Sequence, residues 1–343
     1  MKNDILNFTL KELQFDFSDK GYPAHRAGQV WKWIYGKSVS DPAKMTDLPK
    51  DLIKDLQAEY DVCALKIKDF LTAKDGTRKY LLELSDGELV ESVLIREDKR
   101  RTICLSTQVG CKFKCPFCAS GLKKLTRNLT AGEIVGQIFL VQQESGEKIT
   151  NIVFMGMGEP LDNFQNLEKA IKMINDSRGF AVGARKITVS TCGVIPGMIK
   201  LMNLGLQVEL SVSMHSADDD LRDKLVPVNR KYPLKELMKV CKQYFRATGR
   251  VITFEYTIIK GENDSLQDAD KLAALAKEVH AKVNIIRCNA FPALGYEPCT
   301  GAQALKFKKR VLAKGVVATI RRSKGADIMA ACGQLAAGST KYG

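Results

Sequence analysis

The chain lacks the long apolar runs that membrane proteins carry and the apolar N-terminal core of a secretory signal. No stretch approaches the roughly 20 apolar residues that span a bilayer, and the opening Met1–Asp4 leads into a mixed polar segment. Low-complexity segments and internal repeats of about 20–50 residues are also missing. These absences argue against secreted, membrane and repeat proteins, so we expect a cytoplasmic globular protein with no membrane partner.

Acidic residues are in the minority: 39 Asp and Glu face 53 Lys and Arg in 343 residues, a net charge of +14. Such an excess indicates a polyanionic partner such as RNA, because phosphate contacts by Lys and Arg release counterions. The stretch 306–324 holds eight basic residues and no acid, and a second basic group follows the densest cysteine run. The members are Lys306, Lys308, Lys309, Arg310, Lys314, Arg321, Arg322 and Lys324, and then Lys123, Lys124 and Arg127. From charge alone, a merely solvated basic face is an equal alternative.

Three patterns of apolar spacing follow one another along the chain. Residues 1–60 show helical spacing and predict a small helical accessory domain that contacts RNA. Residues 61–97 alternate with period two around Asp75-Gly76 and Asp86-Gly87, which predicts an antiparallel segment with type I′ hairpin turns. Residues 98–343 alternate strand-like and helical segments, which predicts an α/β fold with a parallel, partial (β/α) barrel. Functional groups are then expected at the C-terminal ends of the strands.

Ten cysteines without a secretion signal do not predict a disulfide framework. Five of them are expected to be buried as small apolar residues: Cys63, Cys192, Cys241, Cys288 and Cys299. Cys111, Cys115 and Cys118 form a C-x₃-C-x₂-C run after the first predicted barrel strand. Three thiolates on a cluster that takes four leave one iron open to a ligand. Zinc, with Cys104 or a distant residue as fourth ligand, is the alternative.

Polar residues stand at the ends of successive predicted barrel strands. Met155-Gly156-Met157-Gly158-Glu159-Pro160 follows the second strand, and its glycines are expected to let the backbone approach a ligand closely. Further along the chain the strand-end residues are Ser190, Ser213, Met214, His215 and Asn289. Taken singly, each is explained by an ordinary loop hydrogen bond. Taken as a series at one edge of a sheet, they indicate a binding site.

Several motifs together carry a resemblance to one enzyme family. The cysteine run with an aromatic Phe117 before its last cysteine is the signature of the radical S-adenosylmethionine (SAM) superfamily. Gln108-Val109-Gly110 before it, the Gly-Met-Gly-Glu-Pro motif and Ala331-Cys332-Gly333-Gln334-Leu335 narrow the match. From about His25 to Leu335 the chain resembles the radical SAM adenine-C2 methyltransferases of 23S ribosomal RNA and tRNA.

The resemblance implies a [4Fe–4S] cluster on Cys111, Cys115 and Cys118, and two SAM molecules per turnover. It further implies SAM contacts from Gly158, Glu159, Ser190, Ser213, Met214, His215 and Asn289. By the same resemblance Cys332 accepts a methyl group from the first SAM. A radical made from the second SAM then takes hydrogen from that methyl group, and the methylene radical adds to adenine. Cys104 then releases the product by forming a disulfide with Cys332, and Glu91 is the proton acceptor. Strand alternation alone would place Glu91 in solvent.

Alternatives remain at this point. The C8-methylating antibiotic-resistance relatives share these motifs, and no single residue dictates which carbon reacts. A non-catalytic zinc-containing RNA-binding protein would explain the charge and the cysteine run, but not the separated Cys104 and Cys332. A dithiol redox enzyme is weaker, because no lone C-x-x-C stands at a helix start. For the methyltransferase we expect an external electron donor such as flavodoxin or ferredoxin, and a monomer.

Overall fold

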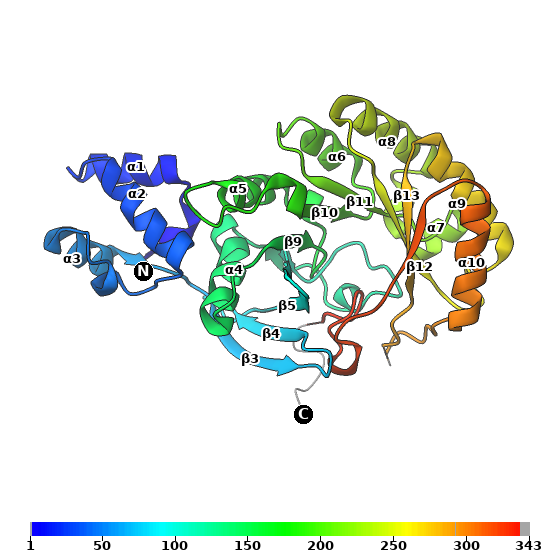
Figure 1. Cartoon of the computed structure of the whole chain (residues 1–343), viewed down its shortest axis with the longest axis horizontal. Coiled ribbons are helices and arrows are strands. Elements are labelled where there is room, and N and C mark those ends of the chain that lie inside the picture. Colours follow the sequence, from blue (N-terminus) through cyan, green and yellow to red (C-terminus); the bar gives the residue numbers. More distant parts are fainter. Residues whose placement is uncertain (1, 292, 337–343) are drawn as a thin grey trace.

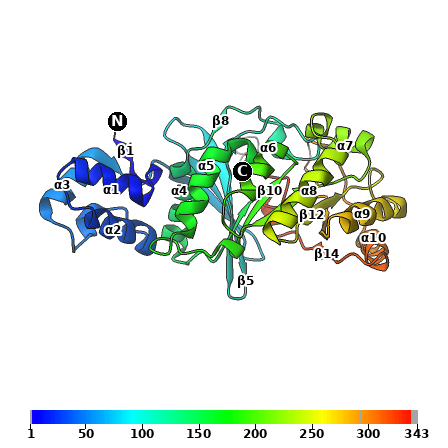
Figure 2. The ribbon, with the colours of Figure 1, turned by 90° about the horizontal axis from the view of Figure 1, so that it is seen from above.

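The computed structural model describes residues 2–291 and 293–336. Three parts follow one another along the long axis of the molecule (Figures 1 and 2): a group of N-terminal helices, a central sheet with α4 and α5, and the curved outer wall of α6 to α10. Among the described residues, no helix has the length and apolar character needed to traverse a bilayer.

One ten-stranded sheet organises the chain from residue 66 onward, in the order β14-β13-β12-β11-β10-β9-β6-β5-β4-β3. From β6 to β14 every neighbouring pair is parallel. These strands are β6 (Arg100–Cys104), β9 (Asn151–Phe154), β10 (Ile187–Thr191), β11 (Glu209–Ser213), β12 (Thr253–Ile258), β13 (Lys282–Arg287) and β14 (Ala318–Arg321). The sheet ends at β14 without pairing back to β3, so the predicted partial barrel is confirmed.

Helices cover the outside of the parallel strands and lie in the connections between them, with α7 and α8 sharing the connection from β11 to β12 (Figure 1). They are α4 (Ala131–Ser145), α5 (Phe164–Asn175), α6 (Ile195–Met202), α7 (Asp219–Leu225), α8 (Leu234–Thr248), α9 (Leu266–Glu278) and α10 (Gly301–Ala313). A capping box opens α4: the Thr130 side chain accepts from the Glu133 backbone N–H, and the Glu133 side chain accepts from the Thr130 backbone N–H. Gly146, with φ of 68°, ends this helix.

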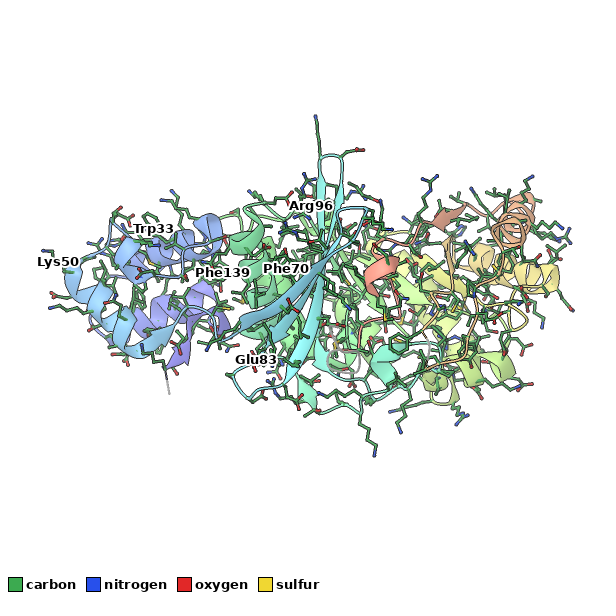
Figure 3. The ribbon with its side chains drawn as sticks, turned by 90° about the horizontal axis from the view of Figure 1, so that it is seen from below. Trp33, Lys50, Phe70, Glu83, Arg96 and Phe139 are labelled. Atoms are coloured by element: carbon green, nitrogen blue, oxygen red, sulfur yellow. The ribbon has the colours of Figure 1, made fainter. Side chains whose placement is uncertain are left out.

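The antiparallel segment is part of the same sheet. Strands β3 (Lys66–Thr72), β4 (Arg78–Glu83) and β5 (Leu89–Glu97) pair in succession, and β5 pairs with β6. Figure 3 shows them from below, with Phe70, Glu83 and Arg96 labelled. The pairing of β5 with β6 makes the predicted antiparallel segment a continuation of the barrel wall. This places residues of β5 next to the first strand of the site.

The two hairpins form where they were predicted, but the turn type was wrong. Gly76 and Gly87 have φ near +80°, whereas Asp75 and Asp86 are not among the residues with positive φ. A type I′ turn needs positive φ at both central residues. Each turn is therefore a three-residue loop that ends in one left-handed glycine. In the first, the Gly76 N–H donates to the Ala73 carbonyl at 3.0 Å and the Ala73 N–H donates to the Thr77 carbonyl at 2.8 Å.

The N-terminal helices pack at one end of the molecule, beside α4 and α5. They are α1 (Leu10–Asp19), α2 (His25–Trp31), continued by a π-helical turn over Lys32–Gly36, and α3 (Lys50–Glu59). Two short strands, β1 (Asn3–Asp4) and β2 (Tyr60–Asp61), pair and close this group. The Asn7 side chain accepts from the Gly132 backbone N–H at 2.8 Å, and so ties the group to the start of α4.

Gly156, after β9, marks a close approach of two backbones. A Cβ there would lie 2.6 Å from the Leu105 carbonyl oxygen, although φ at Gly156 is compatible with alanine. We therefore expect Gly156→Ala to lower the free energy of unfolding by about 1–3 kcal/mol through steric overlap. Gly28→Ala is the matched control, because a Cβ on this α2 glycine meets nothing within 4 Å. Urea denaturation measures both; an undiminished stability of Gly156→Ala would refute the overlap.

Candidate active site

An open cavity of about 980 Å³ lies at the C-terminal ends of the parallel strands. Most of the residues predicted from the sequence line it: Cys111, Cys115, Cys118, Gly158, Glu159, Ser190, Ser213, His215, Asn289 and Cys332. They come from the ends of β10 and β11, from the loops after β6, β9, β11 and β13, and from the C-terminal segment, residues 322–336. The strand-end series therefore forms one site. Met214 does not line this cavity; its side chain is fully buried.

The loop that carries the three cysteines is closed at its base. Strands β7 (Gln108–Val109) and β8 (Arg127–Asn128) pair, and the Cys111 N–H donates to the Lys123 carbonyl at 3.1 Å. Gly110, with φ of 78°, is required there, because a Cβ would lie 2.2 Å from the Lys124 carbonyl oxygen. The loop is thus held so that all three thiols face the same cavity.

Burial keeps these thiols protonated in the bare protein. It raises the pKa of Cys111 to about 12 and raises the pKa of Cys115 and Cys118, with further contributions from the neighbouring cysteines. Among the described residues, no group of three or more His, Cys, Asp or Glu side chains is arranged to hold a single metal ion. A donor set of three soft thiols beside a large cavity fits an iron–sulfur cluster that leaves one position for a ligand.

His215 is a neutral, buried imidazole whose orientation is fixed. Its Nδ1 accepts from the Thr257 backbone N–H at 2.9 Å, so the ring proton sits on Nε2. Burial, followed by the nearby charge of Arg222, lowers the pKa of His215 to about 3. The Phe117 ring packs edge-on against it, with centroids 4.9 Å apart. The backbone of His215 has φ of 55°, which turns the chain sharply at the end of β11.

Glu159 is almost completely buried, and its carboxylate organises the loop after β9. One oxygen accepts from the Leu161 N–H at 3.0 Å and the other from the Cys192 N–H at 2.8 Å. Burial raises the pKa of Glu159. The carboxylate oxygens have further lone pairs that can accept from an ammonium group at the cavity surface.

The glycines of this motif also have a structural role within the protein. The space beside Gly156 is filled by the backbone of Leu105, and a Cβ at Gly158, where φ is 94°, would lie 2.5 Å from Gln108 Cβ. Both glycines therefore allow close contact within the protein on their Cβ side. Gly156 and Gly158 nevertheless line the cavity with their backbones.

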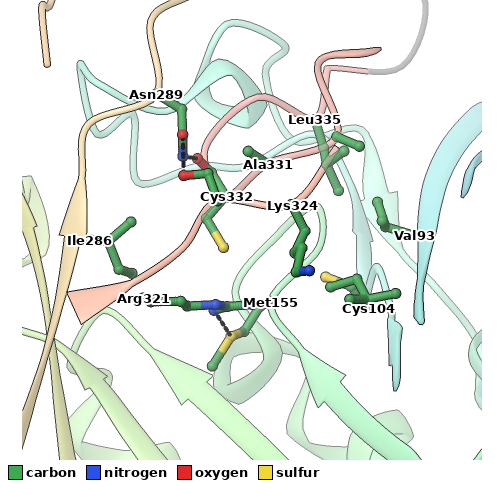
Figure 4. A pocket seen from close by; sticks show the side chains of 13 residues that line it. Val93, Cys104, Met155, Ile286, Asn289, Arg321, Lys324, Ala331, Cys332 and Leu335 are labelled. Carbon is green, nitrogen blue, oxygen red and sulfur yellow. Dashed lines mark hydrogen bonds between the residues drawn. The ribbon is translucent and has the colours of Figure 1, made fainter. Parts of the chain in front are cut away.

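Cys332 and Cys104 face a smaller cavity of about 450 Å³ that adjoins the first (Figure 4). Met155, Asn289, Arg321 and Cys332 line both cavities, whereas Cys104, the last residue of β6, lines only the smaller one. Both thiols are free, and burial raises the pKa of Cys104 to about 12.

Asn289 anchors the loop that carries Cys332. Its Nδ2 donates to the Cys332 carbonyl at 3.0 Å, and its Oδ1 accepts from the Ser323 hydroxyl at 2.6 Å. The side chain of Asn289 thus holds the loop at the cavity, in addition to the ligand contact that was predicted for it.

Glu91, on β5, lies outside both cavities. Only 1% of its surface is exposed, so the solvent-facing alternative is wrong, because the C-terminal segment covers this face of β5. Its carboxylate lies 3.3 Å from Lys79 Nζ and accepts from the Ala336 N–H at 2.8 Å. Lys79 Nζ also donates to the Met329 carbonyl at 3.4 Å. The Lys79–Glu91 pair therefore joins the antiparallel strands to the segment that carries Cys332.

The basic stretch 306–324 does not form one solvated face. Arg310 and Lys314 both pair with Asp270 on α9, and Lys324 lies 3.8 Å from Glu97. Arg321 ends β14 and points into the site, where its pKa is raised mainly by the Cys332 thiol (Figure 4). In the second basic group Lys123 pairs with Glu88, and Arg127 pairs with Asp86 and Glu133. Apart from Glu133, which lies six residues from Arg127, the acids that neutralise these residues come from elements distant in sequence.

Sequence reasoning missed several residues at the site. Arg222 and Glu255 are buried ionisable side chains, and Glu255 lines the large cavity, held by Asn284 Nδ2 at 2.9 Å. Cys192, expected only as a buried apolar residue, lines it too. Arg222 lies in an acid-rich segment that reads as a solvent-facing helix, and Glu255 lies within an apolar strand, so neither carries a sequence signal of its own.

Comparisons with known proteins agree with this geometry. Residues 105–273 match the model of the radical SAM superfamily, and residues 3–62 match that of the ribosomal RNA large subunit methyltransferase N-terminal domain. The chain is 44% identical to the dual-specificity RNA methyltransferase RlmN of Geotalea uraniireducens, over 97% of this chain and 96% of that protein. It is 43% identical to a probable RlmN of Bacillus thuringiensis subsp. konkukian, over 99% and 95% of the two chains. The crystal structure of a radical SAM methyltransferase from Sphaerobacter thermophilus superimposes with a TM-score of 0.94 at 41% identity, covering 98% of this chain and 99% of that one.

The depressed pKa of His215 predicts a pH dependence of stability. An unfolded histidine binds a proton near pH 6.5, but this one does so near pH 3. Its stabilising contribution is therefore present above about pH 6.5 and is lost as the pH falls, by at most about 1.4 kcal/mol per pH unit. Between about pH 7 and pH 5, His215→Asn should reduce the decline in the free energy of unfolding of the cluster-free protein.

Asparagine suits this test because it tolerates positive φ and can accept from the Thr257 N–H. His25→Gln, at an exposed position, is the control and should keep the wild-type slope. Chemical denaturation at several pH values gives the slopes. Equal slopes for His215→Asn and the wild type would rule out His215 as the source.

Proposed function

Because the chain belongs to the RlmN family of dual-specificity RNA methyltransferases, within the radical SAM superfamily, we propose that it methylates C2 of adenine in RNA. The substrates are 23S ribosomal RNA, at the peptidyl-transferase centre, and tRNA, next to the anticodon. The observation that carries the proposal is the joining of two cavities, one lined by three cluster thiols and the other by Cys332 and Cys104. Nothing favours C8 methylation or a zinc-containing RNA-binding protein.

The enzyme uses a [4Fe–4S] cluster and SAM, and we assign the cluster to Cys111, Cys115 and Cys118. When bound, the cluster and SAM together supply a radical able to remove a hydrogen atom from an unactivated methyl group. SAM takes the rest of the large cavity, beside Gly158, Glu159, Ser190, Ser213, His215 and Asn289. Met214 supports the site from behind, because its backbone N–H donates to the carbonyl of Glu255, which lines the cavity, at 2.9 Å. The protein binds and orients these groups and excludes water from them.

Cys332 is the proposed methyl carrier. Its half-buried thiol lies where the two cavities meet and can therefore meet both SAM and an adenine base. As a thiolate it takes a methyl group from one SAM by displacement at carbon, which leaves S-adenosylhomocysteine. Arg321 lines both cavities beside Cys332 and places a positive charge at the point of methyl transfer.

Cys104 and Glu91 are assigned to the release of the product. After the methyl carbon has joined adenine, the RNA is tethered to Cys332. The Cys104 thiolate would then attack the Cys332 sulfur, so that a disulfide forms and the bond from this sulfur to the tethered carbon breaks; that carbon keeps the electron pair, takes up a proton and leaves as the new methyl group. Glu91 is the proposed proton acceptor. Lys79 and the Ala336 N–H hold its carboxylate in place.

The remaining partners follow from the same proposal. Residues 1–60 form the accessory domain that contacts RNA, residues 61–97 the antiparallel segment and residues 98–343 the radical SAM barrel. The exposed Lys306, Lys309 and Arg322, with no ion pair recorded in the described part of the chain, bind phosphates. We infer a monomer that acts in the cytoplasm and takes electrons from an external donor such as flavodoxin or ferredoxin.

The direct test is to incubate the reconstituted enzyme, SAM and a reductant with protein-free 23S ribosomal RNA or tRNA. Mass spectrometry of the digested RNA should find C2-methyladenosine in both, and Cys332→Ala should form none, because it lacks the sulfur that carries the methyl group. Methylation at C8 alone, or undiminished methylation by Cys332→Ala, would contradict the proposal.

The alanine variants of Cys104 and Cys332 should stop the methylation reaction at different stages. Cys104→Ala leaves methyl loading and addition intact but removes the thiol that breaks the tether, so RNA crosslinked to Cys332 should accumulate. A ribonuclease-sensitive band of raised mass reports it. The double variant should show no crosslink, because the step lost in Cys332→Ala comes first. Cys241→Ala, a buried cysteine outside both cavities, is the control and should behave as the wild type. Absence of the adduct in Cys104→Ala would exclude a resolving role.

A further inference from the structure

Arg222, on α7, is a completely buried arginine without a carboxylate partner among the described residues. Its guanidinium donates only to neutral acceptors. These are the carbonyls of Cys192 at 2.8 Å, Ser213 at 3.1 Å and Met214 at 3.1 Å, and Asn229 Oδ1 at 2.8 Å. The nearby Asp219 carboxylate instead accepts from Asn229 and from the Leu234 N–H.

A buried charge of this kind needs a compensating charge. Moving a guanidinium out of water costs several kcal/mol even after relaxation, and hydrogen bonds to neutral groups repay only part of it. Arg222 is also held rigidly, because its guanidinium group donates to four acceptors on three segments of the chain. The bare protein thus presents a fixed positive charge beneath the site, and the described residues supply no anion in contact with it.

Arg222 lies under the floor of the large cavity. Two of its acceptors, Cys192 and Ser213, line that cavity together with the three cluster cysteines. Its charge acts on Cys115 and on His215, which both line that cavity. A [4Fe–4S] cluster with three thiolates is anionic, and it gains one more negative charge on reduction.

We propose that Arg222 is the buried counter-charge of the iron–sulfur cluster and raises its reduction potential, so that the cluster accepts an electron more readily. A fixed positive charge stabilises the reduced cluster more than the oxidised one, because the reduced cluster carries the larger negative charge. The inference rests on the proposed cluster ligands, and it is independent of which RNA or which adenine carbon is methylated. Arg222 acts through the cluster and is a positioning residue.

The test is a redox titration of the full-length, cluster-loaded protein without RNA or SAM, followed by electron paramagnetic resonance. At a fixed solution potential, Arg222→Gln should lower the ratio of reduced to oxidised cluster about tenfold, a shift of about 59 mV for one electron. Arg222→Lys keeps the charge and should stay within about threefold of the wild type. Arg250→Gln is the matched control and should leave the ratio unchanged, since Arg250 pairs with Glu209 at the opposite end of β11.

Each outcome either supports or overturns the proposed role of Arg222. A wild-type ratio in Arg222→Gln, or an equal loss in Arg222→Lys and Arg222→Gln, would overturn the proposal. If both variants fail to load the cluster, Arg222 is needed only for folding, and the proposal also fails. If Arg222→Lys loads the cluster and Arg222→Gln does not, charge compensation is supported. The proposed function is judged separately, because a wild-type protein with the expected potentials that methylates no adenine would refute that function alone.

Discussion

The parallel pairing of β6 to β14 is the constraint on which the rest of the structure depends. Strands that run in one direction bring all their carboxyl ends to one edge, and every loop that leaves this edge can contribute to one cavity. The register is set by buried apolar residues such as Ile103, Ile152 and Ile187, which lie level with one another in successive strands. The cysteine loop, the Gly-Met-Gly-Glu-Pro segment and His215 therefore meet, although up to about a hundred residues separate them in sequence.

A parallel sheet that does not close leaves an open side, and the C-terminal segment covers it. The Ala119 N–H donates to the Gly333 carbonyl at 2.7 Å, and the Ser120 hydroxyl donates to the Leu335 carbonyl at 2.8 Å. These bonds join the segment to the end of the cysteine loop, whereas Lys79 and Glu91 join it to the antiparallel strands. Cys332 is thus fixed against three separate parts of the chain: the cysteine loop, the antiparallel strands and, through Asn289, the loop after β13. A thiol that must meet both SAM and a base needs such support, because a small displacement would take it out of reach of one of them.

Much of this arrangement could be predicted from the sequence, because strand–helix alternation and short motifs act locally. The capping box at Thr130, the strands and the series of strand-end residues needed only neighbours in sequence. What escaped prediction depends on partners distant in sequence. Arg321 belongs to a basic stretch of the sequence, but it is the last residue of β14 and its side chain therefore points into the site. Strand alternation alone predicts an exposed Glu91, but the C-terminal segment covers this residue in the fold. The hairpin turn type was missed because Asp-Gly suits more than one turn.

The buried ionisable groups show how far the site departs from a core optimised for stability. Burial raises the pKa of Glu159 and Glu255 and lowers that of His215, so each is held away from its ordinary protonation behaviour. In a core without function these groups would cost stability that apolar residues of similar volume would not. They lie at one edge of one sheet, around the cavity that the three cysteines line. The barrel's packed apolar core, including Phe254 and Tyr256 on β12, supplies the stability that lets this edge keep charges and unpaired thiols out of water. Placing them there gives the enzyme an apolar, preorganised setting, in which electrostatic interactions are stronger than in water.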